Sequence, residues 1–79
     1  MRERITITPK DLALETMEGE ANSYVRHAPA IIGHVSGKVK RARRLRIPES
    51  VIRDRLLKAI TDPQTADPAR VMEITRLFL

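Results

Sequence analysis

A dense run of basic side chains, KVKRARRLRIP at residues 38–48, is the stretch of this chain best suited to chemistry with another molecule. It contains six lysines and arginines and no acidic residue. The planar guanidinium of arginine fits phosphate oxygens and the O6/N7 edge of guanine, and the compact charge of lysine also binds phosphate. The run therefore predicts contact with nucleic acid or with an acidic protein surface. The candidate nucleic-acid-binding residues in it are Lys38, Lys40, Arg41, Arg43, Arg44 and Arg46.

The charge of the chain is unevenly distributed along the sequence. The net charge of the whole chain is +5. Residues 9–25 hold one lysine against four acids, a net charge of −3, whereas residues 38–58 hold nine basic residues against two acids, a net charge of +7. A concentrated basic block favours nucleic acid, DNA before RNA, or an acidic protein as the partner. The alternative is that the acidic segment packs beside the basic segment within one fold.

Residues that support catalysis or metal binding are sparse. The chain has no cysteine, and His27 and His34 do not have the spacing of a metal-binding pair. Glu15 and Glu18 lie three residues apart, which is typical of a solvated acidic face on a helix. Residues 33–37 contain two glycines and predict a turn, because they match neither a phosphate-binding loop nor a dinucleotide fingerprint. We therefore expect no enzymatic activity, no cofactor and no metal.

The length of the chain, 79 residues, allows one small domain spanning residues 1–79. We divide it into an N-terminal helix-containing extension, residues 1–37, and a basic strand with two helices, residues 38–79. A core this small is marginal in a monomer, and oligomerisation is a common remedy. Tyr24 and Phe78 are the only aromatic residues, which argues against a surface for base stacking. The uncharged runs are too short to span a bilayer, so we expect a cytoplasmic protein without membrane contact.

The N-terminal third of the chain predicts an amphipathic helix over about residues 9–27. Thr8 is a suitable N-cap and Pro9 suits the first helical position. Apolar residues then follow at intervals of three and four, as on the buried side of a helix. Pro29 limits the helix at its C-terminal end.

Two further helices are predicted in the C-terminal half, over residues 49–61 and 68–78. The first has an apolar stripe and an acidic residue, Glu49, placed four residues before Arg53 as a stabilising ion pair. The second follows Asp67, a suitable N-cap, and has proline at its first position.

The segment between the first two helices, residues 30–47, has two interpretations. Its apolar residues, Val35 and Val39 among them, have a spacing that fits a buried helical face, but two glycines and several β-branched residues argue against a helix. We predict a hairpin, or a single strand that ends at Ile47. A short strand or arm is also predicted at residues 4–8. The predicted fold class is therefore a small, mainly α domain with short β structure.

As a strand, residues 42–47 would place Arg44 and Arg46 on one face and Leu45 and Ile47 on the other. The apolar pair would close a small core, and the arginines would face phosphates or bases. Such a strand has no partner in the C-terminal half, so we expect it to pair with its copy in a second chain.

This order of elements, RLRIPESVIRDRLLKAI followed by DPARVMEITRLFL, resembles the ribbon-helix-helix family of DNA-binding proteins. The resemblance covers residues 42–79. It implies an intertwined homodimer whose paired strands enter the major groove, with Arg44 and Arg46 reading bases and Ala42 as a third outward position. It also implies phosphate contact near the start of the last helix, through backbone N–H groups and Arg70.

A homodimer of this kind would bury apolar side chains of the strand and of both helices. The chain also ends on the apolar residues LFL, which we expect to pack against another subunit. The expected dimer-interface residues are Leu45, Ile47, Ile52, Leu56, Ile74 and Phe78.

Three functions follow from these observations. The first is a small dimeric DNA-binding regulator. The second is a protein-interaction module, such as a phage-type inhibitor, a secretion-associated factor or an antitoxin-like binder, whose basic segment meets an acidic protein. The third is an RNA- or ribosome-associated protein that binds phosphate without reading bases.

Overall fold

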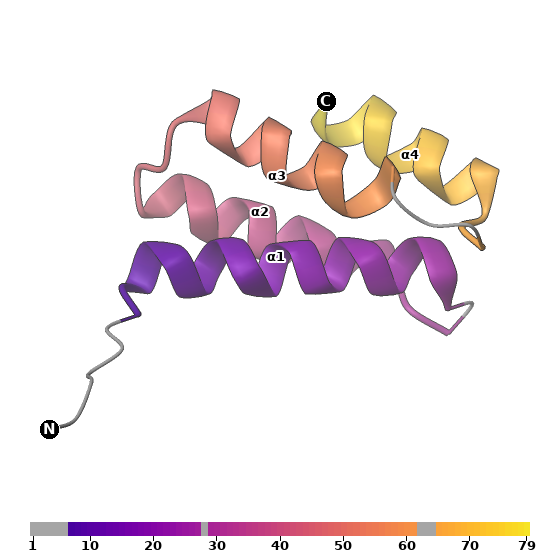
Figure 1. Cartoon of the computed structure of the whole chain (residues 1–79), viewed down its shortest axis with the longest axis horizontal. Coiled ribbons are helices and arrows are strands. Elements are labelled where there is room, and N and C mark those ends of the chain that lie inside the picture. Colours follow the sequence, from indigo (N-terminus) through magenta and orange to yellow (C-terminus); the bar gives the residue numbers. More distant parts are fainter. Residues whose placement is uncertain (1–6, 28, 62–64) are drawn as a thin grey trace, which may run out of the picture.

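Four α-helices make up the computed structural model, which describes residues 7–27, 29–61 and 65–79 (Figure 1). They are α1 (Pro9–Arg26), α2 (Ile32–Arg44), α3 (Glu49–Thr61) and α4 (Pro68–Phe78). The three helices predicted from capping and spacing are confirmed, with ends that agree to within one residue. The prediction of a mixed fold with β structure is wrong, because no strand occurs in the described ranges. The strand predicted at residues 4–8 lies largely outside them.

Helix α2 replaces the strand or hairpin that the sequence predicted. Its buried face consists of Val35, Val39 and Ala42, each with an exposed fraction of 0%. These residues recur at intervals of three and four and pack against the core that α1 shares. Their burial outweighs the helix propensity lost at glycines and β-branched residues, which is about 1 kcal/mol or less per residue. Residues 42–47 therefore do not form the strand of a ribbon-helix-helix dimer.

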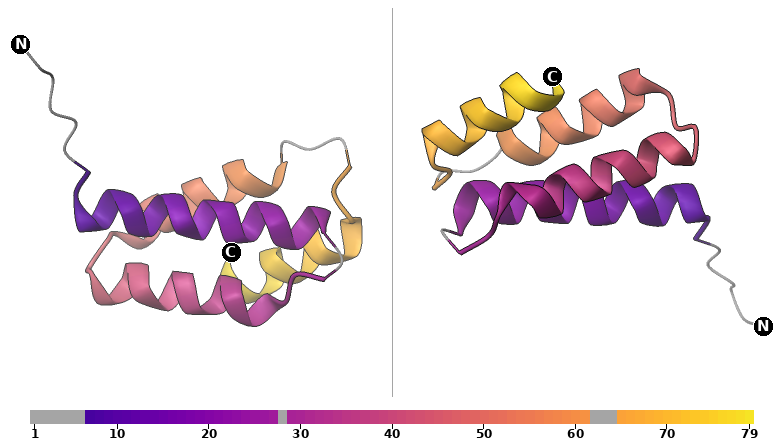
Figure 2. Two further views of the ribbon diagram at one scale, coloured as in Figure 1. Left: turned by 90° about the horizontal axis from the view of Figure 1, so that it is seen from below. Right: turned by 180° about the vertical axis from the view of Figure 1, so that it is seen from behind.

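The helices form a flattened bundle in which α1 packs against each of the other three. α1 and α2 run side by side in opposite directions and form one layer. α3 and α4 lie together on one face of this layer (Figures 1 and 2). The outer helices α2 and α4, both fully described, do not pack against each other. Each of them therefore keeps a wide exposed side. The predicted division between residues 37 and 38 falls inside α2.

One apolar core joins the four helices. Its largest fully buried side chains are Met17 on α1, Ile52, Leu56 and Ile60 on α3, and Ile74 on α4. Each such side chain contributes about 1.5–3 kcal/mol through removal of apolar surface from water. Because α3 lies against α1 and carries three of these side chains, α1 and α3 form the centre of the bundle.

The starts of α1 and α4 have the predicted caps. Thr8 Oγ1 accepts a hydrogen bond from the backbone N–H of Asp11 at 3.1 Å. Asp67 Oδ1 accepts one from the N–H of Ala69 at 3.0 Å. The Asp67 N–H in turn donates to the carbonyl oxygen of Val25 at 2.7 Å. The cap of α4 is thus tied directly to the last turn of α1.

A polar cluster holds α4 against the junction of α1 and α2. Arg70 Nη1 donates to the carbonyl oxygens of Tyr24 at 3.1 Å and Ala30 at 2.9 Å. The guanidinium also lies 4.4 Å from the centroid of the Tyr24 ring, a cation–π geometry. The Tyr24 hydroxyl donates to Glu73, and this hydrogen bond, together with burial of the hydroxyl, raises the pKa of Tyr24. Only the neutral phenol can donate this bond, so the contact is complete at neutral pH.

Candidate nucleic-acid interface

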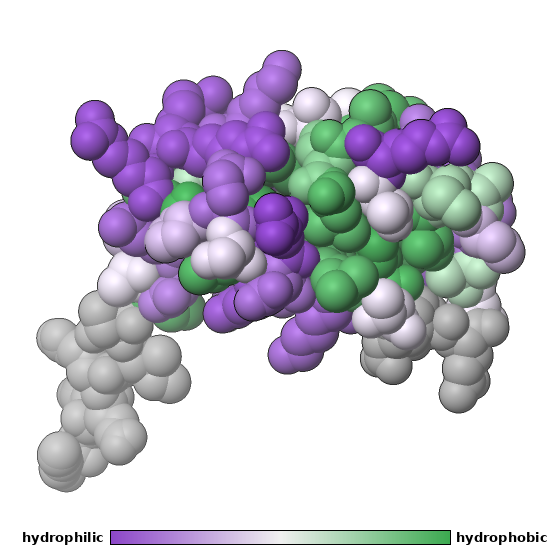
Figure 3. Space-filling view, turned by 90° about the horizontal axis from the view of Figure 1, so that it is seen from above, coloured by the Kyte–Doolittle hydropathy of each residue, from purple (hydrophilic) through white to green (hydrophobic). Residues whose placement is uncertain are grey.

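The basic run occupies the exposed side of α2 and the connection to α3. Lys40, Arg41 and Arg44 are exposed, and their spacing places them on the side of α2 away from its buried residues. Arg46 in the connection and Arg53 on α3 are also exposed. We call these five residues the basic end. Figure 3 shows hydrophilic side chains covering the end of the molecule where α2 passes into α3.

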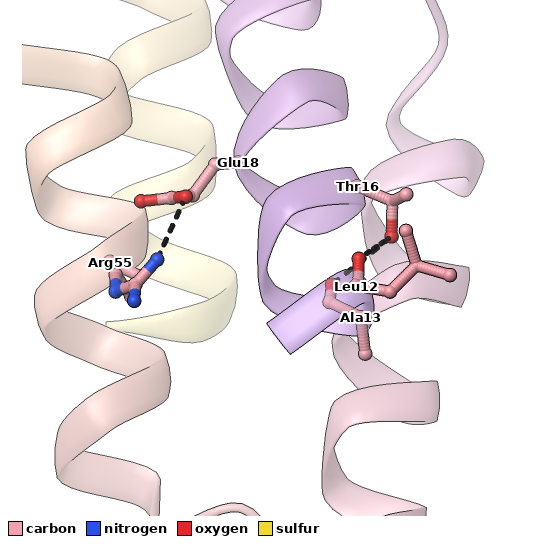
Figure 4. A network of polar contacts seen from close by, with 5 residues as sticks. All are labelled: Leu12, Ala13, Thr16, Glu18 and Arg55. Carbon is pink, nitrogen blue, oxygen red and sulfur yellow. Dashed lines mark hydrogen bonds and ion pairs between the residues drawn. The ribbon is translucent and has the colours of Figure 1, made fainter. Parts of the chain in front are cut away.

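The charges of the basic end are not neutralised within the described chain. None of its five residues has a carboxylate within ion-pair distance among the described residues. The neighbouring arginines differ, because Arg43 Nε lies 3.0 Å from Glu49 Oε2 and Arg55 Nη1 lies 3.1 Å from Glu18 Oε1 (Figure 4). The predicted pair between Glu49 and Arg53 is absent, since Glu49 binds Arg43 instead. The basic end therefore keeps its positive charge, which an anionic partner would neutralise.

Arg46 is held in an unusual backbone conformation. Its φ is 63°, in the left-handed region that favours glycine. The Arg46 N–H donates to the carbonyl oxygen of Arg43 at 2.9 Å, and the Ile47 N–H donates to that of Ala42 at 3.2 Å. These are the two hydrogen bonds of a Schellman motif, in which glycine usually occupies the position of Arg46. The end of α2 thus places an arginine, at a cost in backbone strain, beside the other cations.

A groove of about 400 Å³ runs along α2 next to the basic end. Within it, His34 Nδ1 lies 3.8 Å from Glu20 Oε1 of α1. Lys38 is half-buried, whereas Arg41 and Arg44 are exposed. None of the described side chains that line it belongs to an apolar residue. We call it the α2 groove, and its lining residues are Glu20, Gly33, His34, Gly37, Lys38, Arg41 and Arg44.

The structure brings most of the predicted nucleic-acid-binding residues to one side of the molecule, but not all of them. Lys38, Lys40, Arg41, Arg44 and Arg46 belong to the basic end or to the α2 groove. They stand on a helix and its C-terminal turn, and not on alternating faces of a strand. The other two members of the predicted set are engaged with groups of the chain itself. Arg43 forms an ion pair with Glu49, and Arg70 on α4 lies over the ring of Tyr24.

The predicted dimer-interface residues lie mostly inside one chain. Ile47, Ile52, Leu56 and Ile74 belong to the core, with exposed fractions of 6% or less. The remaining two are half-buried and pack against that core, namely Leu45 and Phe78. A homodimer stays a prediction, and four of its six expected interface residues are already buried within the chain.

Sequence reasoning did not predict that Gly33 and Gly37 lie in a helix and line a groove. Both lie within α2 with negative φ and line the α2 groove, so the turn predicted at residues 33–37 is wrong. The available signal was their spacing of four residues, followed at the same interval by Arg41.

Other features of the described chain do not form a second site of recognisable chemistry. A shallow groove of about 730 Å³ between α1 and α3 has a mixed lining that includes Asn22, His27 and Lys58. Within the described ranges, no three histidine or acidic residues lie together as metal ligands would. The expectation that the protein is not an enzyme stays a prediction.

Comparison with known proteins gives no relative for this chain. No protein-family model matches it, and no match was found among curated proteins or among solved structures. None of the described helices combines the length and the apolar character needed to cross a membrane.

Proposed function

We propose that this protein binds nucleic acid by its phosphate backbone, through the basic end formed by Lys40, Arg41, Arg44, Arg46 and Arg53. The observation that carries the proposal is the contrast among neighbouring arginines. Arg43 and Arg55 are paired with carboxylates, whereas the five residues of the basic end are exposed and have no such partner among the described residues.

The helical context suits contact with phosphate. α2 contains no acidic residue, so no carboxylate on this helix repels an anion approaching its outer side. Arginine binds phosphate oxygens with two parallel N–H groups, and each phosphate neutralised releases counterions. Affinity should therefore depend steeply on salt concentration.

Duplex nucleic acid is favoured over single strands that stack on aromatic rings. Tyr24 is buried and Phe78 is half-buried, so neither presents an open ring face for a base. The strand that would have entered the major groove is absent from residues 42–47. Phosphate contacts fix position without carrying sequence information, so we expect binding to depend little on base sequence.

The test is titration of a fluorescent random-sequence DNA duplex with the parent protein and two variants. An Arg41→Ala, Arg44→Ala double variant should lose affinity and lower the slope of log K against log salt by about 0.9 for each phosphate that the variant no longer neutralises. Arg76→Ala is the matched control, because Arg76 is an exposed arginine on α4, a helix that does not contact α2. It should change both quantities far less.

Two results would contradict the proposal. One is the absence of duplex binding by the parent protein even at about 50 mM salt, where backbone contacts are strong. The other is equal loss of affinity in the double variant and in Arg76→Ala after correction for the number of charges removed. Either result would leave the basic end as a surface for an acidic protein.

A further inference from the structure

We propose that one strand of the duplex backbone lies in the α2 groove, against the helix surface at Gly33 and Gly37, with Lys38, Arg41 and Arg44 on its phosphates. This inference rests on the proposed function and makes it specific. It replaces a general basic surface with a defined track along one helix.

The charge and shape of the α2 groove carry the argument. Three cationic side chains line it, and none of them has a carboxylate within ion-pair distance in the described part of the chain. Among the described residues, the one acid in its lining is Glu20, whose Oε1 lies 3.8 Å from His34 Nδ1. No apolar side chain of a described residue lines the groove, so it lacks the apolar pockets that anchor an amphipathic protein helix. A polyanion matches the positive charge of this lining.

Gly33 and Gly37 would allow the nucleic-acid backbone to approach the surface of α2 closely. A Cβ added at Gly33 or Gly37 would meet nothing within 4 Å, so packing within the chain does not require glycine at either position. Neither has a positive φ, so the backbone does not require it either. The exposed helix surface between them is therefore bare, which admits an approach that side chains would block.

The length of the track fits several nucleotides. Gly33 and Arg44 are eleven residues apart on one helix, which corresponds to about 16 Å along its axis. One strand of a duplex advances about 3.4 Å along the duplex axis per nucleotide and also winds around that axis, so a straight track of this length contacts fewer than about five phosphates. Glu20 lies toward the glycine end and Arg44 lies at the other, so phosphates should be held most firmly toward Arg44.

The glycines also supply the experiment, because the chain contains only three of them. Glycine amides appear in a separate region of an ¹⁵N–¹H correlation spectrum. On addition of the DNA duplex to the full chain, the signals of Gly33 and Gly37 should shift. The signal of Gly19, an exposed glycine on α1 outside the α2 groove, should stay in place.

Substitution at the same positions gives the second measurement. Gly37→Leu fills the groove without changing charge, and should weaken duplex binding by about tenfold, as expected when one or two phosphates can no longer be reached. Gly19→Leu is the matched control, since a Cβ there also meets nothing within 4 Å. Both variants should fold, because leucine is a better helix former than glycine. Circular dichroism checks this.

The outcomes separate this inference from the proposed function. If the parent protein does not bind the duplex, the proposed function fails. If it binds and Arg41→Ala, Arg44→Ala weakens binding, but Gly37→Leu binds like Gly19→Leu or the signals of Gly33 and Gly37 do not move, the backbone lies elsewhere on the basic end. That result would overturn the track and leave the function in place.

Discussion

Arg46 has two roles, because it ends helix α2 and also adds a positive charge to the surface. Its left-handed φ of 63° closes the Schellman motif that ends α2, and Pro48 follows two residues later, as is common after such an end. A glycine would adopt this conformation without strain. Arginine at this position adds a guanidinium to the basic end but strains the backbone. We therefore expect it to favour anion binding at the expense of folding stability.

Arg46→Gly should therefore stabilise the protein and weaken duplex binding. Relief of strain of about 1–2 kcal/mol, less about 0.4–1 kcal/mol for the greater freedom of glycine in the unfolded chain, leaves a gain of up to roughly 1.6 kcal/mol. Denaturant unfolding measures the gain. Arg44→Gly removes the same charge inside the last turn of α2 and should lose up to about 1 kcal/mol. Equal destabilisation by the two variants would contradict the assigned conformation of Arg46.

At the scale of secondary structure, the sequence predicted the helices that carry their own end signals. Thr8 and Asp67 cap α1 and α4, and the expected hydrogen bonds are present. α2 has no such signals. Ile31 stands at its N-cap without a side-chain hydrogen bond, and an arginine occupies the position usual for glycine at its other end.

The residues inside α2 also favoured the wrong prediction of a strand or hairpin. Its glycines and β-branched residues lower helix propensity, which is a local property of the sequence. Contact with α1 is a tertiary effect, and it determines the outcome because Val35 and Val39 are fully buried by it. The basic residues of the candidate site were predictable from composition, whereas their arrangement around one helix was not.

Ala42 distinguishes the helix from the predicted strand. On the strand this residue would have pointed outward beside the arginines, but in α2 its exposed fraction is 0%. Ala42→Lys should then destabilise the protein by about 3 kcal/mol or more, because it overpacks the core and buries an unpaired charge. Thermal and denaturant unfolding measure this. Lys40→Ala, two residues away and exposed, should stay within about 0.5 kcal/mol of the parent. Tolerance of lysine at position 42 would favour the strand.

At the scale of the whole molecule, the basic end and the apolar surface of α4 lie apart. Figure 3 shows apolar side chains gathered over the part that contains α4, away from the hydrophilic end where α2 meets α3. α4 buries only Ile74 fully among its 11 residues, and Met72 and Leu77 are 53% and 56% exposed. An apolar surface of this kind on a small domain favours association. Because the basic ends lie apart from it, two copies joined there would not bring their positive charges together.

The predicted homodimer should therefore form through the exposed side of α4, and not through residues already in the core. Leu77→Lys should shift the protein from dimer to monomer in sedimentation equilibrium, because a lysine in the contact would lose its hydration without gaining a partner. Leu12→Lys is the matched control, since Leu12 is 51% exposed in the first turn of α1. Figure 1 shows that α1 begins at the end of the bundle away from α4. Both substitutions add one charge at an exposed position and should leave the fold intact. If the parent chain sediments as a monomer at micromolar concentration, or if both variants behave alike, α4 is not the contact between copies. The apolar side of α4 would then be a surface for a different protein, and each chain would bind nucleic acid as a monomer.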